Sequence, residues 1–441
     1  MSPEVTAAII AGSVGIVTVI ATVIVQIVGF RSTKANTEQQ IKATHKDTAD
    51  TLGQQSEHLD KTLAEQREQL DKTLRAQSEQ LDKTLAEQRT RTLNERFATA
   101  AEQLGSDKPA VRLAGVHAMS GLADDWEKNR QTCVDVLCAY LRMPYEPYPG
   151  QDAPAPQRLA FQAIREVRHT VIRVIAAHLK EDAAVSWQGL NFDFTGVVFD
   201  GGDFRGAQFS GGTVDFSGAT FSDGIVNFQQ ARFSGSVADF SSARFFGGGV
   251  DFRLVEFSGG TVDFSGATFS GAALFSNARF SGGAVSFRFA GFTGGMVEFI
   301  NARFSGARID FNRAEFSGSA VRFDGARFSR GRVNFSNAIF SSGAVDFGAA
   351  EFSGGTVYFS SARFSGGTVY FSTAEFSGSE VYFNFSEFSG ARVTFHNAGF
   401  SGGTVDFSDP GDWSVPPAFP WVDTAPSGVK LPKDDQSLPL R

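Results

Sequence analysis

Phenylalanine recurs through the second half of this chain at a spacing that few folds can accommodate. Of the 45 Phe residues, 41 lie between Phe192 and Phe407. From Phe209 onward the spacings alternate between seven and five residues, so the repeat is 12 residues long, and the unit that ends at Phe275 is one residue short. Two positions before each Phe stands Val or Ala in nearly every unit, and the residue between them is mostly polar. This alternation is typical of strands with one buried face, and the Ser-Gly pairs that follow suit corners.

A 12-residue unit is too short to bury its own apolar face, whereas stacked units can bury a continuous core. We therefore predict a β-solenoid over residues 182–409, with Phe side chains stacked inside it. The alternative is a disordered Phe/Gly-rich chain. Such a chain has no reason to fix Val or Ala two residues before each Phe. We expect about 24 residues per coil, made of two 12-residue units, because a 12-residue coil at about 3.3 Å per residue has little room for two Phe rings.

The repeat resembles the pentapeptide-repeat family, whose units read A-(D/N)-(L/F)-x-x. The stretches V-D-F-S-G at 214–218 and A-T-F-S-D at 219–223 match two such units, and Gly212 and Thr213 form a two-residue insertion. The uninterrupted form is found around Phe194–Phe209. The resemblance implies a right-handed, four-sided β-helix. Residues 91–126 are similar to a helical segment that lies between membrane helices and pentapeptide repeats in actinobacterial proteins. The chain is thus identified as a membrane-anchored, bacterial (actinobacterial-type) pentapeptide-repeat protein.

The N-terminus carries a long apolar run, since no charged residue occurs between Glu4 and Arg31. About 20 apolar residues cross a bilayer core, and this run is longer, so we predict a transmembrane helix over residues 1–30. The alternatives are a signal peptide and a buried soluble helix. Basic residues that a signal peptide needs are missing before the apolar run, and the run is too long for one. Arg31 and Lys34 follow the span and no Lys or Arg precedes it. The positive-inside rule then predicts a single-pass protein of the cell membrane, with its N-terminus outside and the bulk of the chain in the cytoplasm.

Residues 31–100 predict a helical stalk. They contain no Pro and carry an 11-residue repeat, LDKTLAEQREQ, LDKTLRAQSEQ and LDKTLAEQRTR, at 59–91. The Leu pairs of the three repeats fall on one narrow stripe, which favours a coiled coil and self-association. The alternative is a solvated single helix supported by the Glu–Lys pairs four residues apart, 57–61, 68–72 and 79–83. Either form spans roughly 100 Å at 1.5 Å per residue.

The region between the stalk and the repeats reads as helical. We expect a small helical segment at 101–143, a Pro-rich linker at 144–156, and a helix at 157–181 that caps the first coil together with Trp187. Cys133 and Cys138 lie five residues apart on the last helix of the first segment, so we interpret them as small buried hydrophobes rather than as a redox pair. The C-terminal tail at 410–441 is Pro-rich and is expected to be irregular and partly disordered, with Trp413, Phe419 and Trp421 folded over the last coil.

No catalytic, cofactor-binding or metal-binding residues can be nominated from this sequence, and we predict neither an enzyme nor a bound cofactor. His117 and His396 stand alone, and the repeats contain no Cys. The recurrent Asp residues of the repeats occupy an outward column that could bind Ca²⁺. Calcium-binding solenoids use a nine-residue pattern that is absent here, so solvated charges are the simpler interpretation. Examples are Asp215, Asp239, Asp251 and Asp263.

One local feature suggests a partner surface. In three successive units, the outward position before Phe changes to Tyr358, Tyr370 and Tyr382. If each coil holds two units, Tyr358 and Tyr382 stack on one face and Tyr370 lies opposite. Exposed aromatic side chains can mark interaction surfaces, although a ladder that only stabilises the sheet is the simpler interpretation.

The charge of the repeats bears on the class of partner. Residues 189–409 carry 20 Asp and Glu against 15 Arg, for a net charge of −5, yet seven Arg fall between Arg303 and Arg332. The family resemblance implies an alternative function, a DNA-mimicking topoisomerase (gyrase) inhibitor or protector, but a rod with a basic waist mimics DNA poorly. Our prediction is therefore a membrane-tethered, non-enzymatic protein-interaction scaffold. It would self-associate through the stalk and bind an unidentified cytoplasmic protein, and we do not expect nucleic acid as a partner.

Overall fold

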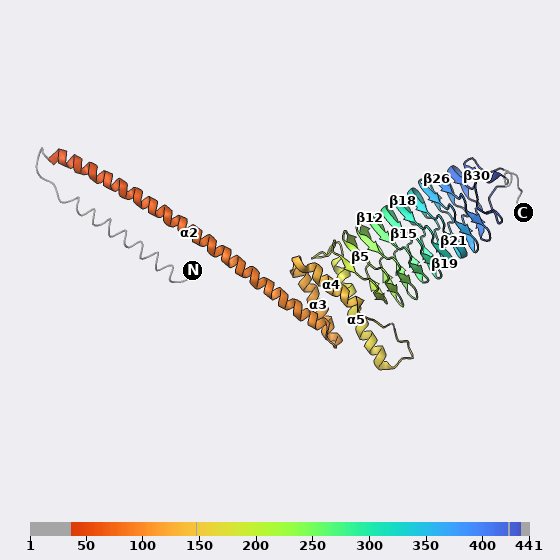
Figure 1. The fold of residues 1–441 in the computed structure, drawn as a ribbon, viewed down its shortest axis with the longest axis horizontal. Coiled ribbons are helices and arrows are strands. Elements are labelled where there is room, and N and C mark those ends of the chain that lie inside the picture. The colour runs from red at the N-terminus through yellow and green to blue at the C-terminus, as the bar shows by residue number, and fades with distance from the viewer. Residues whose placement is uncertain (1–36, 147, 422–423, 434–441) are drawn as a thin grey trace. The chain divides into compact units, whose positions relative to one another are not determined.

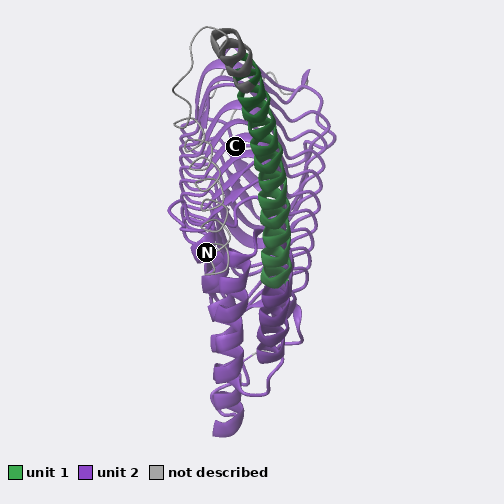
Figure 2. Cartoon of the chain, turned by 90° about the vertical axis from the view of Figure 1, so that its left-hand side faces the viewer, with its two compact units in different colours: residues 1–90 green, residues 91–441 purple. Residues whose placement is uncertain are grey.

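The computed structural model of the chain describes residues 37–146, 148–421 and 424–433. The chain divides into two compact units, residues 1–90 and residues 91–441 (Figure 2). The first unit holds most of one long helix, and the second holds the shorter helices and the β-solenoid (Figure 1).

The long helix α2 spans Thr37–Leu104. Its leucine stripe is open to solvent within the first unit: the exposed fraction is 53% for Leu59, 42% for Leu63 and 59% for Leu70. Of the three Glu–Lys pairs expected along the stalk, only Glu68 and Lys72 lie within ion-pair distance, at 2.6 Å between Oε1 and Nζ. Charge pairs therefore contribute little to this helix, and its apolar stripe has no partner among the described residues.

Three further helices follow, and a short 3₁₀ turn links two of them: α3 (Pro109–Asp125), η1 (Glu127–Asn129), α4 (Arg130–Arg142) and α5 (Ala155–His178). The end of α2 packs closely on α3, since a side chain at Gly115 would collide with the backbone at Leu104. Val116, Met119 and Leu122 of α3 are fully buried in the core beneath. Burial of one face explains why these short helices are stable.

The N-terminal edge of the solenoid is covered by helices. Helix α4 packs against strand β1 (Phe192–Asp193), and α5 packs against strand β3 (Gly202–Asp203). Trp187 is fully buried, and its ring stacks on His178 with 4.0 Å between centroids. Arg168 of α5 donates hydrogen bonds to the carbonyl oxygens of Leu141, at 2.7 Å, and Val198, at 2.8 Å, and so joins α4 to the first coil. These contacts satisfy an edge that would otherwise be open to pairing with another chain.

The solenoid is right-handed and is built from two parallel sheets. Among the described residues, sheet A contains β1 (Phe192–Asp193), β4 (Gln208–Ser210), β5 (Thr213–Asp215), β8 (Arg232–Ser234), β9 (Val237–Asp239), β12 (Glu256–Asp263), β15 (Arg279–Ser286), β18 (Arg303–Asp310), β20 (Arg327–Asn334), β22 (Glu351–Phe352), β23 (Thr356–Tyr358), β26 (Glu375–Tyr382), β29 (Gly399–Asp406) and β30 (Val429–Lys430).

Sheet B lies on the other side of the core. Its described strands are β2 (Val198–Phe199), β3 (Gly202–Asp203), β6 (Thr220–Phe221), β7 (Ile225–Asn227), β10 (Arg244–Phe245), β11 (Gly249–Asp251), β13 (Thr268–Phe269), β14 (Ala272–Leu274), β16 (Gly291–Phe292), β17 (Met296–Glu298), β19 (Glu315–Arg322), β21 (Ile339–Asp346), β24 (Arg363–Phe364), β25 (Thr368–Tyr370), β27 (Glu387–Phe388) and β28 (Arg392–Thr394).

Each coil holds two of the 12-residue units, as the sequence predicts. Phe304 pairs with Phe328 in the next coil, which is two full units further along the chain. The separation falls to 23 where Phe257 pairs with Phe280, because the short unit lies between them. It falls to 22 in the first coil, where Phe199 pairs with Phe221, because the uninterrupted five-residue units lack the insertion. The chain therefore keeps its Phe residues in register by changing the coil length.

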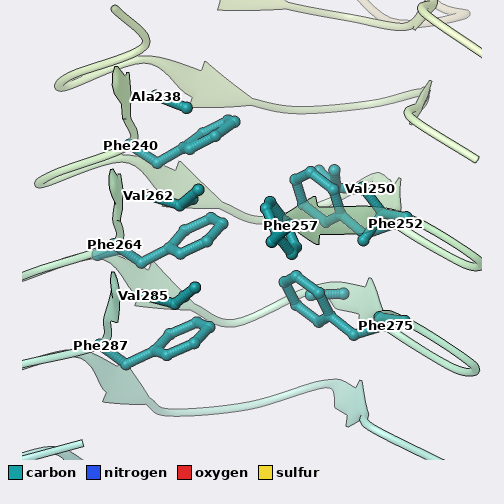
Figure 3. Packing of buried hydrophobic residues seen from close by; sticks show 14 of the residues in the cluster. Ala238, Phe240, Val250, Phe252, Phe257, Val262, Phe264, Phe275, Val285 and Phe287 are labelled. Atoms are coloured by element: carbon teal, nitrogen blue, oxygen red, sulfur yellow. The ribbon is translucent and has the colours of Figure 1, made fainter. Parts of the chain in front are cut away.

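The core is formed by stacked Phe rings. In one stack, the ring of Phe311 lies 4.7 Å from that of Phe287 and 4.6 Å from that of Phe335, nearly parallel to both. Across the core, Phe311 meets Phe299 edge to face at 6.1 Å and 86°. Figure 3 shows the same stacking at Phe264, between Phe240 and Phe287, with Ala238, Val262 and Val285 alongside the rings. Both geometries are favoured for aromatic pairs, and they repeat from coil to coil.

Backbone conformation fixes the corners. Each Phe-x-x-Ala turn closes with a hydrogen bond, such as that from the Ala302 amide to the Phe299 carbonyl at 3.0 Å. The third turn residue has positive φ, which Asn301 tolerates but which strains bulky residues such as Phe289 and Phe385. At the second corner Gly260 has φ of +72°, and a Cβ there would collide with a carbonyl of the coil before it. Glycine is therefore required at this corner by both strain and space.

The C-terminal segment continues the solenoid up to residue 430. Ala418 pairs with Thr394, and β30 pairs with β29, each one full coil after its partner. The ring of Phe419 stacks on Phe395 at 5.5 Å, and Trp413 meets Phe388 edge to face at 5.2 Å. Trp413 and Phe419 thus pack over the last coil, as expected, and the pairings with Thr394 and β29 add ordered backbone at this end. Prolines are tolerated here because an edge strand need not donate every amide.

The prediction of a single-pass cell-membrane protein is wrong, because the helices that the structure describes contradict it. In the part of the chain that the structure describes, no helix combines the length and the apolar composition that a membrane span needs. Helix α2 is long enough, but charged residues occur throughout it. The apolar segment at 1–30 on which the prediction rested lies outside the described residues.

Candidate interaction surface

Two of the three tyrosines come together on sheet A. Tyr358 ends β23 and pairs in register with Tyr382, which ends β26. Their rings stack with 5.5 Å between centroids and an angle of 20°. The guanidinium carbon of Arg332 lies 4.4 Å above the Tyr358 ring, within the range of a cation–π contact. The three side chains form a continuous stack along the outer face, which we call the tyrosine stack.

The third tyrosine lies on the opposite face. Tyr370 ends β25 of sheet B, where it pairs with Asp346 on one side and Thr394 on the other. It therefore stands without a neighbouring aromatic ring in its own column. The expected division of the three tyrosines between two faces is correct, and their role as a partner surface stays a prediction.

The hydroxyl of Tyr382 is held by a carboxylate. It donates a hydrogen bond to Oε2 of Glu380 at 3.2 Å. Partial burial, followed by this hydrogen bond to a carboxylate, raises the pKa of Tyr382 above its ordinary value. The hydroxyl therefore stays protonated at neutral pH, and the stack presents aromatic faces flanked by one cation.

Arginines form a second feature of sheet A. Arg279, Arg303 and Arg327 begin three successive strands and pair with one another in register. In the second halves of two of these strands, Arg308 pairs with Arg332, the residue that covers Tyr358. The basic waist seen in the sequence is thus concentrated on one sheet, next to the tyrosine stack. The sequence alone showed the excess of arginine but not the shared face.

The outward aspartates serve the turns. Oδ1 of Asp215 accepts a hydrogen bond from the amide of Ser217 at 2.8 Å, and Oδ1 of Asp239 accepts one from Ser241 at 2.7 Å. Asp251 and Asp263 make the same contact with the amide two residues ahead. Asp is therefore recurrent because it stabilises the turn after each strand. No group of three or more potential metal ligands is found among the residues that the structure describes.

The comparison with protein families agrees with this geometry. Residues 299–350 match the family described as pentapeptide repeats (9 copies). The strand registers and Phe stacks of this stretch continue into the coils on both sides. Residues 299–350 are therefore similar to pentapeptide repeats, and they form part of the continuous solenoid. No curated protein and no solved structure matches the chain.

A buried charge network joins the helices to the first coil of the solenoid. Asp200 is almost fully buried and accepts hydrogen bonds from the Tyr145 hydroxyl at 2.6 Å and from Nε of Arg165 at 2.8 Å. Nε2 of His169 lies 2.9 Å from its other oxygen. Burial alone would raise the pKa of Asp200, but these hydrogen bonds and charges outweigh it and lower the pKa to about 2.

The sequence analysis missed this network, since its members come from a linker, a helix and a turn that are far apart in the chain. A second contact at the same end was also missed. Nε1 of Trp187 donates to Asp124 at 3.0 Å, and Nε2 of His178 lies 3.1 Å from the same carboxylate. Every one of these polar groups has a protein partner, so we assign both clusters to holding the helices on the solenoid.

The cysteines of α4 are buried, as expected. Cys133 and Cys138 have no exposed surface and form no disulfide. Burial raises the pKa of the Cys133 thiol to about 11, and it raises that of Cys138 to about 12. Both thiols are therefore protonated at neutral pH and suit packing rather than redox or nucleophilic chemistry.

Proposed function

We propose that this chain is a non-enzymatic protein-interaction scaffold whose partner surface is on sheet A of the pentapeptide-repeat solenoid. One observation carries the proposal: Arg332, Tyr358 and Tyr382 form a stacked, outward-facing cluster on a rigid sheet. Tyr and Arg are enriched among the residues that dominate the energy of protein interfaces. A tyrosine ladder that only stabilised the sheet would not require a cation above the aromatic ring, as Arg332 lies above Tyr358.

The scaffold is preorganised. The strands that carry the cluster rest on Phe359, Phe376 and Phe383, which are fully buried and stacked on equivalent rings of neighbouring coils. A side chain on such a core loses little backbone freedom when a partner binds. Preorganisation lowers the entropic cost of association, so a small surface can bind specifically.

The stalk supports a scaffold with more than one solenoid. The leucines of the 11-residue repeats are 42% to 59% exposed on α2, and no described residue covers them. Identical stripes on two copies of this chain are complementary to each other, and their association would bury the leucines. We therefore propose a second copy of this chain as the partner of the stripe. Two linked solenoids would bind a repetitive partner with higher avidity than one.

Proximity labelling in the native host tests the scaffold. The labelling tag follows Arg441 on the full chain, and the chain truncated after residue 181 serves as the background. We expect the full chain to label a small set of proteins that the truncated chain does not label. The double variant Tyr358→Ser, Tyr382→Ser should no longer label this set. Tyr370→Ser, on sheet B, is the matched control and should keep the set. Equal labelling by the full and truncated chains would contradict the scaffold.

The DNA-mimic alternative needs a separate assay. The fold is shared by both functions, so the comparisons do not distinguish them. The stacked arginines of sheet A disfavour mimicry, because a phosphate backbone presents negative charge on every face. A gyrase supercoiling assay with the full chain distinguishes the two functions. Inhibition that depends on the solenoid would reject the scaffold and support the DNA mimic.

A further inference from the structure

Three arginines of one column lie directly above one another. Arg279, Arg303 and Arg327 pair in register in β15, β18 and β20, at exposed positions. Parallel neighbours in a sheet are about 4.8 Å apart, so the three positions span about 10 Å along the solenoid. Like charges placed directly opposite each other destabilise a sheet. This arrangement therefore has a cost that the fold itself does not require.

Two arginines of this column are paired with carboxylates. Arg232 lies 3.4 Å from Glu256 of the next coil, and Arg327 lies 3.2 Å from Glu351. Arg279 pairs in register with Glu256 and Arg327 with Glu351, but neither Arg279 nor Arg303 has an ion pair among the described residues, so their guanidinium groups remain available.

These arginines line a groove. Together with Asn277, Asn301 and Gly325 they enclose an open depression of about 340 Å³. It adjoins a larger depression of about 830 Å³ that shares Asn277 and Arg279 and reaches Lys180 at the end of the helical cap. Guanidinium and amide side chains supply many donors to the floor of the central part. The matching ligand is a group with several acceptor oxygens and a negative charge.

We propose that this groove binds an acidic segment of a partner polypeptide through its carboxylate side chains. The proposal rests on the scaffold function and names the chemistry of its partner. Arg binds carboxylates through two parallel hydrogen bonds, which gives both strength and orientation. Arg279 and Arg303, the two arginines without an ion pair among the described residues, are about 4.8 Å apart along the solenoid, so one or two carboxylate side chains of a peptide can reach both.

The charges around the groove favour a short acidic segment over a nucleic acid. Glu181, Asp182 and Glu256 line its other part, and the repeats have a net charge of −5. A nucleic acid binds tightly when basic side chains neutralise many successive phosphates. Beyond the arginines of this groove, its phosphates would meet the carboxylates instead. A peptide can place its acidic residues only where the arginines are.

The test measures binding of a short fluorescein-labelled oligoglutamate to the full chain by fluorescence anisotropy. We expect binding that weakens with salt, and a loss of about tenfold or more in Arg279→Gln with Arg303→Gln, since two charge-assisted pairs disappear. The matched control is Arg244→Gln with Arg392→Gln. These two exposed arginines of sheet B also lack an ion pair with a described residue, and their replacement should change the affinity by less than about twofold.

Two results would overturn the inference. One is oligoglutamate binding that is absent or equal in both double variants. The other is a single-stranded oligothymidylate of the same charge that binds more tightly than oligoglutamate and depends on the same arginines, which would assign the groove to nucleic acid. Proximity labelling of the Arg279→Gln, Arg303→Gln chain separates this failure from that of the scaffold. A partner set that survives in this variant while oligoglutamate fails to bind would retain the scaffold and reject the groove.

Discussion

The stalk is built from 11-residue repeats and the solenoid from 12-residue repeats, yet the two regions treat their apolar side chains in opposite ways. Phe311 in the solenoid has no exposed surface, whereas Leu70 in the stalk is 59% exposed. In the solenoid, every two units complete a coil, which places equivalent side chains directly on those of the coil before. In a single α-helix, the apolar stripe cannot be covered by the helix itself. The same kind of repetition therefore gives a self-sufficient core in one region and an unsatisfied stripe in the other.

The largest test of this comparison removes one ring from the solenoid. Phe311→Ala deletes a fully buried side chain between two stacked neighbours, and we expect the free energy of unfolding to fall by about 3–5 kcal/mol. Hydrogen exchange of the amides of the adjoining coils measures the loss locally. Unchanged protection in those coils would mean that the rings are not coupled as their geometry indicates.

A second test adds one methyl group at a corner. Gly260→Ala imposes positive-φ strain and a collision with the coil before it, and we expect a loss of about 3 kcal/mol. Urea unfolding followed by circular dichroism measures this change. Gly53→Ala in the stalk is the matched control, because no atom of another residue lies near its missing Cβ. That control should be neutral or slightly stabilising, since Ala favours helix.

The third test concerns the attachment of the helices. Because the pKa of Asp200 is about 2 when folded, below its ordinary value of 3.8, its ionised form stabilises the fold above about pH 4. This contribution, roughly 2 kcal/mol, is lost as the pH falls from about 4 to about 2. Hydrogen exchange of α5 should therefore accelerate across this range in the wild type.

The dependence should disappear in Asp200→Asn. Asp203→Asn is the control, since Asp203 is 57% exposed and pairs with Arg205 only at 3.5 Å. If Asp203→Asn abolished the acid dependence and Asp200→Asn did not, the buried network would not be what holds α5.

The smallest expected effect on stability belongs to the stalk. Leu70→Ala with Leu74→Ala should change the unfolding free energy of the solenoid by less than about 0.5 kcal/mol, because exposed side chains contribute little within one chain. The same variant should weaken self-association, as measured by sedimentation equilibrium. Arg75→Ala with Glu79→Ala alters the far side of the helix without changing the net charge and should leave association intact. A monomeric wild-type chain would contradict the paired stalk.

Much of the fold could be predicted because repetition makes local and global preferences agree. The Val-x-Phe pattern and the corner glycines specify a strand and a turn in every unit, so the coil length followed from spacing alone. The candidate surface was only partly predictable. Tyr358, Tyr370 and Tyr382 stand out as departures from a column of Asp. The contact of Arg332 with Tyr358, however, joins residues one coil apart and depends on side-chain direction.

The sequence by itself determined the periodicity of this protein: which residues face the core, where the corners lie, and that the repeats must stack. Tertiary structure alone decided which groups outside the periodic pattern come together. It placed Arg332 over the Tyr358 ring, brought Tyr145 and Arg165 to Asp200, and carried the proline-rich segment around to β30 as a further coil. The physical reason is range. Periodicity records interactions between near neighbours, whereas the charge and burial of a group depend on atoms that only the folded chain brings within a few ångströms.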